Sequence, residues 1–203
     1  MGRMIFLTTL FIISISLQSR SQSVSFSGSN YANAGNAAPL HVTNFTLEAW
    51  VKIEGTGATT SSGSGGVTLV PFIAKGRAES ELAAVDVNYI FGYDLTTRKL
   101  VADFEDNATS ANHPVTGNTA LGACWTHVAA TYNTATNTWK LCINGVLDQT
   151  LALGAAFTPQ SLSNVSTAIG TSLNSTNATE GFFNGSLDEL LVWNVVRTDA
   201  EIF

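Results

Sequence analysis

The sequence predicts an all-β fold in which two antiparallel sheets pack as a jelly-roll sandwich. Apolar and polar residues alternate with a period of two along several short segments, as they do in strands with one buried face. Turns rich in Gly, Asn and Ser separate these segments, and no segment shows the periodicity of an amphipathic helix. The 203 residues are 45% hydrophobic and only 12% charged, which suits one domain with a sizeable core.

The first 21 residues have the pattern of a secretory signal peptide. Arg3 precedes an apolar run from Met4 to Leu17, and the small residues Ser19 and Ser21 follow it. The run is too short to span a membrane comfortably. We therefore expect residues 1–21 to be a cleaved signal and residues 22–203 to form one secreted domain without a membrane span.

Short strands are expected from the start of the mature part. The first passes through Val24 and Phe26 and ends at a Gly-rich corner, and the second is FTLEAWVKI (45–53). A low-complexity loop (55–66) lacks the spacing of a phosphate-binding loop. Three further strands are expected in TLVPFIAKG, NYIFGYDL and KLVADFED, with Pro71 at an edge or a bulge.

The clearest pattern is a three-strand antiparallel meander in residues 124–151. The turn formers of residues 133–137 separate its first two strands, and Asn144-Gly145 marks a tight turn before the third. Alternation predicts that each of the first two strands turns one set of side chains to the core. The sets are Val128, Ala130 and Tyr132, and Trp139, Leu141 and Ile143.

The same register separates the two cysteines of the chain. With a turn centred between Ala135 and Thr136, Cys142 faces Ala129, and Cys124 lies five residues further along its strand. Five residues span about 16 Å in a strand, whereas a disulfide joins Cα atoms up to about 7 Å apart. We expect both cysteines to be unpaired.

Two late strands are expected in STAIGTSL and GSLDELLVWN, and the chain then ends in RTDAEIF. Thr198 and Glu201 form the pattern of a capping box, which marks the start of a helix. A helix this short is marginal alone. It either packs on the sandwich or begins a continuation, and we expect the chain to be the N-terminal part of a longer secreted protein with further domains.

Four segments resemble the laminin-G-like domains of the concanavalin A-like lectin and glucanase superfamily. The segment WTHVAATYNTATNTWKLCING resembles the W-x-H-V-A-x-T-Y-D…W-x-L-Y-x-N-G core of these domains. The segments FSGSNYANAG, FTLEAWVK and GSLDELLVWNVVRTDAEI are similar to their opening hairpin, second strand and closing strand. The resemblance implies a jelly roll that acts as a binding module beside other domains and often carries a structural calcium.

Catalysis is disfavoured by the acidic residues. Glucanases of the superfamily place carboxylates on one face of a strand with the pattern E-x-D-x-x-E, which is absent here. Glu105 and Asp106 are adjacent and point to opposite faces, and Glu79 and Glu81 fall in an expected loop. We expect a non-catalytic module that binds a glycan or an extracellular protein. A structural or adhesive spacer without a ligand is the alternative, and a glycan-degrading hydrolase is third.

The resemblance also implies candidate metal ligands. Asp188 matches an acid of the closing motif, and Asn30 lies near the acidic position of the opening hairpin. These two residues are the candidate calcium ligands, although Ser27 replaces the family's aspartate. The alternative is that Asp188 caps a turn or pairs with a cation.

Aromatic residues in loops are the candidates for glycan contact, because sugars bind beside exposed rings and polar groups. The expected ligand-binding residues are Phe182, Phe183, Tyr93 and His113. The four tryptophans lie in expected strands, which favours core packing for most of them. The net charge of −6 disfavours nucleic acid as a direct partner.

Overall fold

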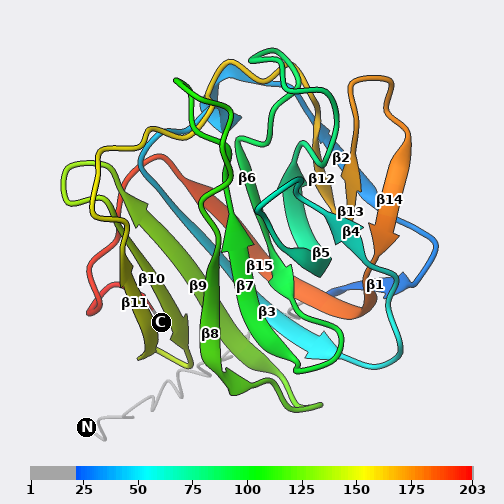
Figure 1. Cartoon of the computed structure of the whole chain (residues 1–203). Helices are drawn as coiled ribbons and strands as arrows, with labels where there is room; N and C mark the ends of the chain where they lie inside the picture. Colours follow the sequence, from blue (N-terminus) through cyan, green and yellow to red (C-terminus); the bar gives the residue numbers. More distant parts are fainter. Residues whose placement is uncertain (1–21, 203) are drawn as a thin grey trace, which may run out of the picture.

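The computed structural model describes residues 22–202, and these residues form two antiparallel sheets packed face to face (Figure 1). The expected signal peptide lies outside the described residues. No α-helix occurs in the described part, where the only helical segment is the 3₁₀ turn Ala38–Leu40. No helix in residues 22–202 is long and apolar enough to cross a membrane. The predicted all-β sandwich is confirmed.

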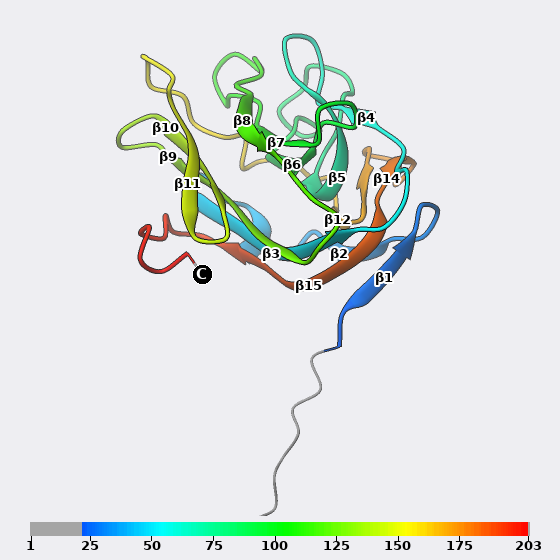
Figure 2. The same ribbon diagram turned by 90° about the horizontal axis from the view of Figure 1, so that it is seen from below.

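Sheet A has six strands in the order β1-β15-β3-β9-β10-β11. Their bounds in this order are Val24–Ser27, Asn184–Trp193, Phe45–Ile53, Thr126–Asn133, Thr138–Ile143 and Val146–Ala152. Figure 2 shows that this sheet is bowed and that its concave side faces the other sheet. Its convex side is therefore the outer face of the molecule.

Sheet B has the strand order β2-β12-β5-β6-β7-β8, and β4 also pairs with β5. The bounds are Ala32–Gly35, Thr167–Ile169, Thr68–Lys75, Tyr89–Tyr93, Lys99–Asp103 and Val115–Ala120, with β4 at Thr60–Ser61. The strands β13 (Thr171–Leu173) and β14 (Thr179–Phe182) form a separate ribbon.

The core lies between the sheets, where the alternating apolar residues of both meet. Val128, Ala130 and Tyr132 of β9 are all 0% exposed, as are Trp139 and Leu141 of β10, and Ile143 packs against them partly buried. The predicted core faces of the meander are thus confirmed. The indole Nε1 of Trp139 donates a hydrogen bond of 2.9 Å to the backbone oxygen of His113, so the polar atom of this buried ring has a partner.

Three local predictions from the sequence are confirmed by the strand register. Cys142 faces Ala129, and both cysteines are free. Pro71 lies at a register shift in β5, a kind of position where a strand tolerates a residue without a backbone N–H.

The C-terminal residues form a single turn rather than a helix within the described part. Glu201 accepts hydrogen bonds from the backbone nitrogen of Thr198 at 2.8 Å and from its hydroxyl at 2.9 Å, so the carboxylate half of the predicted capping box is present. Ile202 is 1% exposed and packs on Ala129 and Cys142. The turn therefore lies on the outer face of sheet A (Figure 2).

Candidate binding site on the outer face of sheet A

The outer face of sheet A carries a row of polar and aromatic side chains at the centre of the sheet. Alternation in β3 turns Leu47, Ala49 and Val51 to the core, so that Trp50 faces outward. Trp50 is paired with Asp188 of β15 on one side and with His127 of β9 on the other. Directly paired residues share a face, so three strands that are distant in sequence bring these side chains into one row.

A shallow depression of about 310 Å³ lies over this row, lined by Trp50, Trp125, Asp188 and Glu189. Trp125 immediately precedes β9 and is 40% exposed. A bulge in β15 falls between Asp188 and Leu191, and Glu189 has a φ of 47° there. A bulge redirects side chains, and this one places Glu189 at the rim of the depression.

The surroundings of the depression are mainly acidic. The Nε2 atom of His127 lies 3.5 Å from Oε2 of Glu48, and Nε of Arg197 lies 4.0 Å from Oε1 of the same carboxylate. Burial lowers the pKa of His127 below its usual value, although the carboxylates of Glu48 and Glu189 act in the opposite direction. His127 is therefore neutral at pH 7 and adds no positive charge to the rim.

This arrangement can bind a sugar but does not resemble a site that cleaves one. An indole ring stacks on the apolar face of a pyranose, and carboxylate oxygens accept hydrogen bonds from its hydroxyls. Asp188 and Glu189 are adjacent at a bulge and line the same rim, whereas a glycosidase places two carboxyl groups on opposite sides of the scissile bond.

The two candidate calcium ligands do not meet. The side chain of Asn30 closes the corner after β1: its Oδ1 accepts from the backbone nitrogen and hydroxyl of Ser27, at 2.6 and 2.9 Å, and its Nδ2 donates to the oxygen of Ser25. Ser25 and Ser27 face Ser186 and Asn184, so Asn30 is held against the first half of β15, and Asp188 lies further along that strand.

Asp188 instead caps its own bulge, because its Oδ1 accepts the backbone nitrogen of Glu189 at 2.9 Å. No group of three or more His, Cys, Asp or Glu side chains that could hold a metal occurs in residues 22–202. Asn30 and Asp188 are therefore each engaged with nearby backbone, and calcium binding by this pair stays a prediction.

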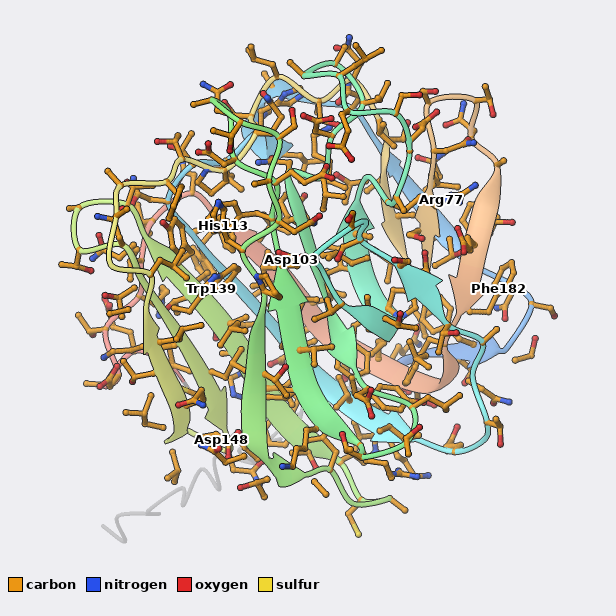
Figure 3. The ribbon with its side chains drawn as sticks, viewed as in Figure 1. Arg77, Asp103, His113, Trp139, Asp148 and Phe182 are labelled. Atoms are coloured by element: carbon orange, nitrogen blue, oxygen red, sulfur yellow. The ribbon has the colours of Figure 1, made fainter. Side chains whose placement is uncertain are left out.

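The four aromatic residues expected to bind ligand do not gather at one open site, because Tyr93 and Phe183 contact each other inside the core. Phe183 and Tyr93 are 0% and 1% exposed and belong to the core, where Phe183 packs edge-on against Phe72. The ring of His113 is stacked on Phe157, with centroids 3.7 Å apart. Phe182 lies at the opposite edge of the molecule from His113 (Figure 3). They form no common site, because the loops expected to expose them are covered by packing.

The positions of the tryptophans contradict the expectation that most of them pack in the core. Trp139 is buried, but Trp50, Trp125 and Trp193 lie outside the core, and the guanidinium of Arg197 sits 4.4 Å above the ring of Trp193. The signal was present in FTLEAWVKI, where Trp50 alternates in phase with Thr46, Glu48 and Lys52 and therefore belongs to the polar face.

The acids of the VADFED segment lie beneath the loops that cover sheet B, not at an open site. Asp103 is 0% exposed and accepts four hydrogen bonds. The donors are the hydroxyl of Ser62, the amide of Asn112 and the backbone nitrogens of Phe104 and His113. Burial raises the pKa of Asp103 to about 7, although these hydrogen bonds act to lower it.

Glu105 is buried beside Asp103 and is 4% exposed. Its carboxylate accepts the backbone nitrogen of Val87. Burial raises the pKa of Glu105 to about 8, and the neighbouring Asp86 adds to this effect. Both carboxyl groups join loops to sheet B, and neither is open to a substrate.

Comparison with solved structures returns domains of the same fold at low sequence identity. The CBM40 domain of the IT-sialidase from Ruminococcus gnavus, bound to α2,3-sialyllactose, superposes with a TM-score of 0.69 at 15% identity and covers 89% of this chain and 94% of its own. Domain 4 of an extracellular arabinanase from Geobacillus stearothermophilus, in complex with arabinotriose, gives 0.55 at 20% identity, over 89% and 74%. The SAP-like pentraxin of Limulus polyphemus gives 0.58 at 16%, over 90% and 80%.

No curated protein sequence matches the chain. A family model described as the concanavalin A-like lectin/glucanases superfamily matches residues 26–203. This match covers almost the whole domain and agrees with its two antiparallel sheets, as the sequence motifs predicted. The chain belongs to the concanavalin A-like lectin/glucanase superfamily.

Proposed function

We propose that this domain is a secreted, non-catalytic carbohydrate-binding module, accessory to other domains, that holds a neutral glycan on the outer face of sheet A. The observation that carries the proposal is the depression between Trp50 and Trp125, with two carboxylates at its rim on an otherwise polar sheet face. Exposed indole beside hydrogen-bonding groups is the chemistry that recognises sugar rings.

The fold is consistent with this role. The similar R. gnavus domain holds sialyllactose, and the similar G. stearothermophilus domain holds arabinotriose. The rim acids Asp188 and Glu189 oppose a negatively charged sugar in the depression. We therefore assign neutral oligosaccharides, of which arabinotriose is one, to this face and not sialylated ones.

The test compares two exposed aromatic residues. Trp125 is 40% exposed in the depression, and Tyr31 is 41% exposed on the corner between β1 and β2. Purified wild-type, Trp125→Ala and Tyr31→Ala domains are applied to an array of neutral and sialylated glycans, and the hits are measured by calorimetry. Loss of one stacking ring is expected to weaken binding at least tenfold in Trp125→Ala and to leave Tyr31→Ala like the wild type.

Each alternative has its own signature in this experiment. Absence of any specific glycan on the array, with all three proteins folded, would support a spacer without a ligand. Release of sugar from a bound glycan, followed by chromatography, would show a hydrolase. Stronger binding of sialylated glycans than of their neutral counterparts would refute the assignment of a neutral ligand while leaving glycan binding intact.

A further inference from the structure

We propose that the end of the sandwich where β3 stops and β6 turns into β7 is a second ligand site, specific for the carboxylate of a sugar acid. A cleft of about 500 Å³ opens there, within the range of small-ligand sites. Ile53 from sheet A and Tyr93 from sheet B, both core residues, form its inner wall.

The hydroxyl of Tyr93 is the first observation that points to a ligand. Tyr93 is 1% exposed, lines the cleft, and its hydroxyl has no hydrogen-bond partner in the described residues. The other two buried tyrosines are satisfied: Tyr89 bonds the hydroxyl of Thr167 at 3.1 Å, and Tyr132 donates to the oxygen of Phe157 at 2.8 Å. Buried hydroxyls almost always have a partner, and Tyr93, which lines the cleft, is the one buried tyrosine of residues 22–202 without one.

A fixed cation lies beside this hydroxyl. Arg98 lines the cleft, and its charge is near enough to oppose the rise that burial causes in the pKa of Tyr93. Two of its nitrogens donate to the backbone, Nε to Leu121 at 3.1 Å and Nη2 to Gly122 at 3.3 Å. The guanidinium is thereby held in place before any ligand arrives, which reduces the entropy lost on binding.

The one acid of the cleft does not cancel this charge. Glu54 is engaged by Lys52 at 2.7 Å and by the hydroxyl of Ser186 at 3.1 Å. The hydrogen bonds from Lys52 and Ser186 lower the pKa of Glu54, as expected for a carboxylate that is already paired. The remaining charge of Arg98 beside a phenol donor matches a carboxylate.

The cleft also has room and apolar surface for a ring. Leu95 is 37% exposed at its rim, and Ile53 is on the inner wall. An apolar wall next to a cation and a hydroxyl fits a uronic acid better than a bare anion. This chemistry is opposite to that of the Trp50–Trp125 depression, where both charged rim residues are acids.

The experiment uses D-galacturonate, its neutral counterpart D-galactose, and acetate as probes of the domain in amide-resolved NMR titrations. Galacturonate is expected to shift the amides of residues 53–56, 93–98 and 121–123 and not those of Asp188 and Glu189, which line the other depression. Tyr93→Phe is expected to weaken this binding at least tenfold without lowering Tm, because its hydroxyl has no partner to lose. Tyr132→Phe, the matched control, is expected to lower Tm and keep the affinity.

Several results would overturn this second site. Equal shifts with galactose would show that the carboxylate is not recognised, and no shifts with galacturonate at millimolar concentration would show that the cleft binds no sugar acid. Equal binding of acetate would show a simple anion site. Unchanged affinity in Tyr93→Phe, or loss of galacturonate binding in Trp125→Ala, would place the carboxylate elsewhere. None of these results depends on neutral glycan binding at the Trp50–Trp125 depression, which the galactose and array data report separately.

Discussion

Replacing Glu105 by glutamine is expected to stabilise the domain at neutral pH and to leave its stability at pH 4.5 nearly unchanged. Burial raises the pKa of Glu105 from 4.5 to about 8, with Asp86, Glu81 and Asp103 adding to the rise, while the backbone nitrogen of Val87 opposes it. A glutamine keeps an oxygen to accept that nitrogen and carries no charge, so it mimics the protonated acid.

The direction in which stability changes with pH follows from the pKa of Glu105 in the folded and in the unfolded state. Because the folded-state value is the higher one, the contribution of Glu105 is fully present below pH 4.5 and is lost as the pH rises through about 8. At pH 7 the folded state still holds the proton and the unfolded state has lost it. At about 1.4 kcal/mol per pH unit, this difference lowers the free energy of unfolding at pH 7 by about 3 kcal/mol relative to pH 4.5.

The magnitude can be measured by urea unfolding of wild type and Glu105→Gln at pH 4.5, 6, 7 and 8, followed by tryptophan fluorescence. The difference in unfolding free energy is expected to grow from near zero to about 3 kcal/mol at pH 7, with a rise in Tm of roughly 6–12 °C. Comparing the two proteins at each pH removes the contributions of Asp103 and the histidines. A difference that is constant with pH, or a variant less stable at pH 7, would refute the buried neutral acid.

Three further predictions concern single positions. Trp139→Ala is expected to destabilise the domain by about 3–5 kcal/mol, because the ring is 0% exposed; an unchanged melting temperature in a soluble variant would place it at the surface. Thermal melts in calcium and in EGTA are expected to coincide, since Asn30 and Asp188 lie apart; a calcium-dependent rise lost in Asp188→Asn would restore the metal site. Both cysteines are free, so a thiol assay in denaturant without reductant is expected to find two; finding none would indicate a disulfide.

The strands themselves could be predicted from the sequence because their signals are local. Alternation in residues 45–53 and 124–151 assigns each side chain to one of two faces, and Asn144-Gly145 fixes a turn and hence a register. This register was sufficient to exclude a disulfide between Cys124 and Cys142. Pro71 was placed at a bulge for the same reason, since a missing N–H restricts where a strand can accept it.

The candidate site could be predicted only in fragments. The polar phase of Trp50 in its strand was visible in the sequence, but its neighbours His127 and Asp188 both come from segments more than seventy residues later in the chain. Likewise, a loop aromatic such as Phe183 looks exposed until it is known that Phe26 and Phe72 pack around it.

The sequence by itself determined most of the long strands, the buried face of the alternating segments 45–53 and 124–143, and the superfamily that the domain resembles. Only the tertiary structure decided that β15, β3 and β9 lie side by side, so that Trp50, Trp125 and the acids of the β15 bulge share one depression. It also decided that Asp103 and Glu105 lie beneath loops and that Tyr93, a buried residue, lines a cleft. The physical reason is that side-chain alternation is a property of neighbouring residues, whereas strand order and burial depend on how distant segments share one core.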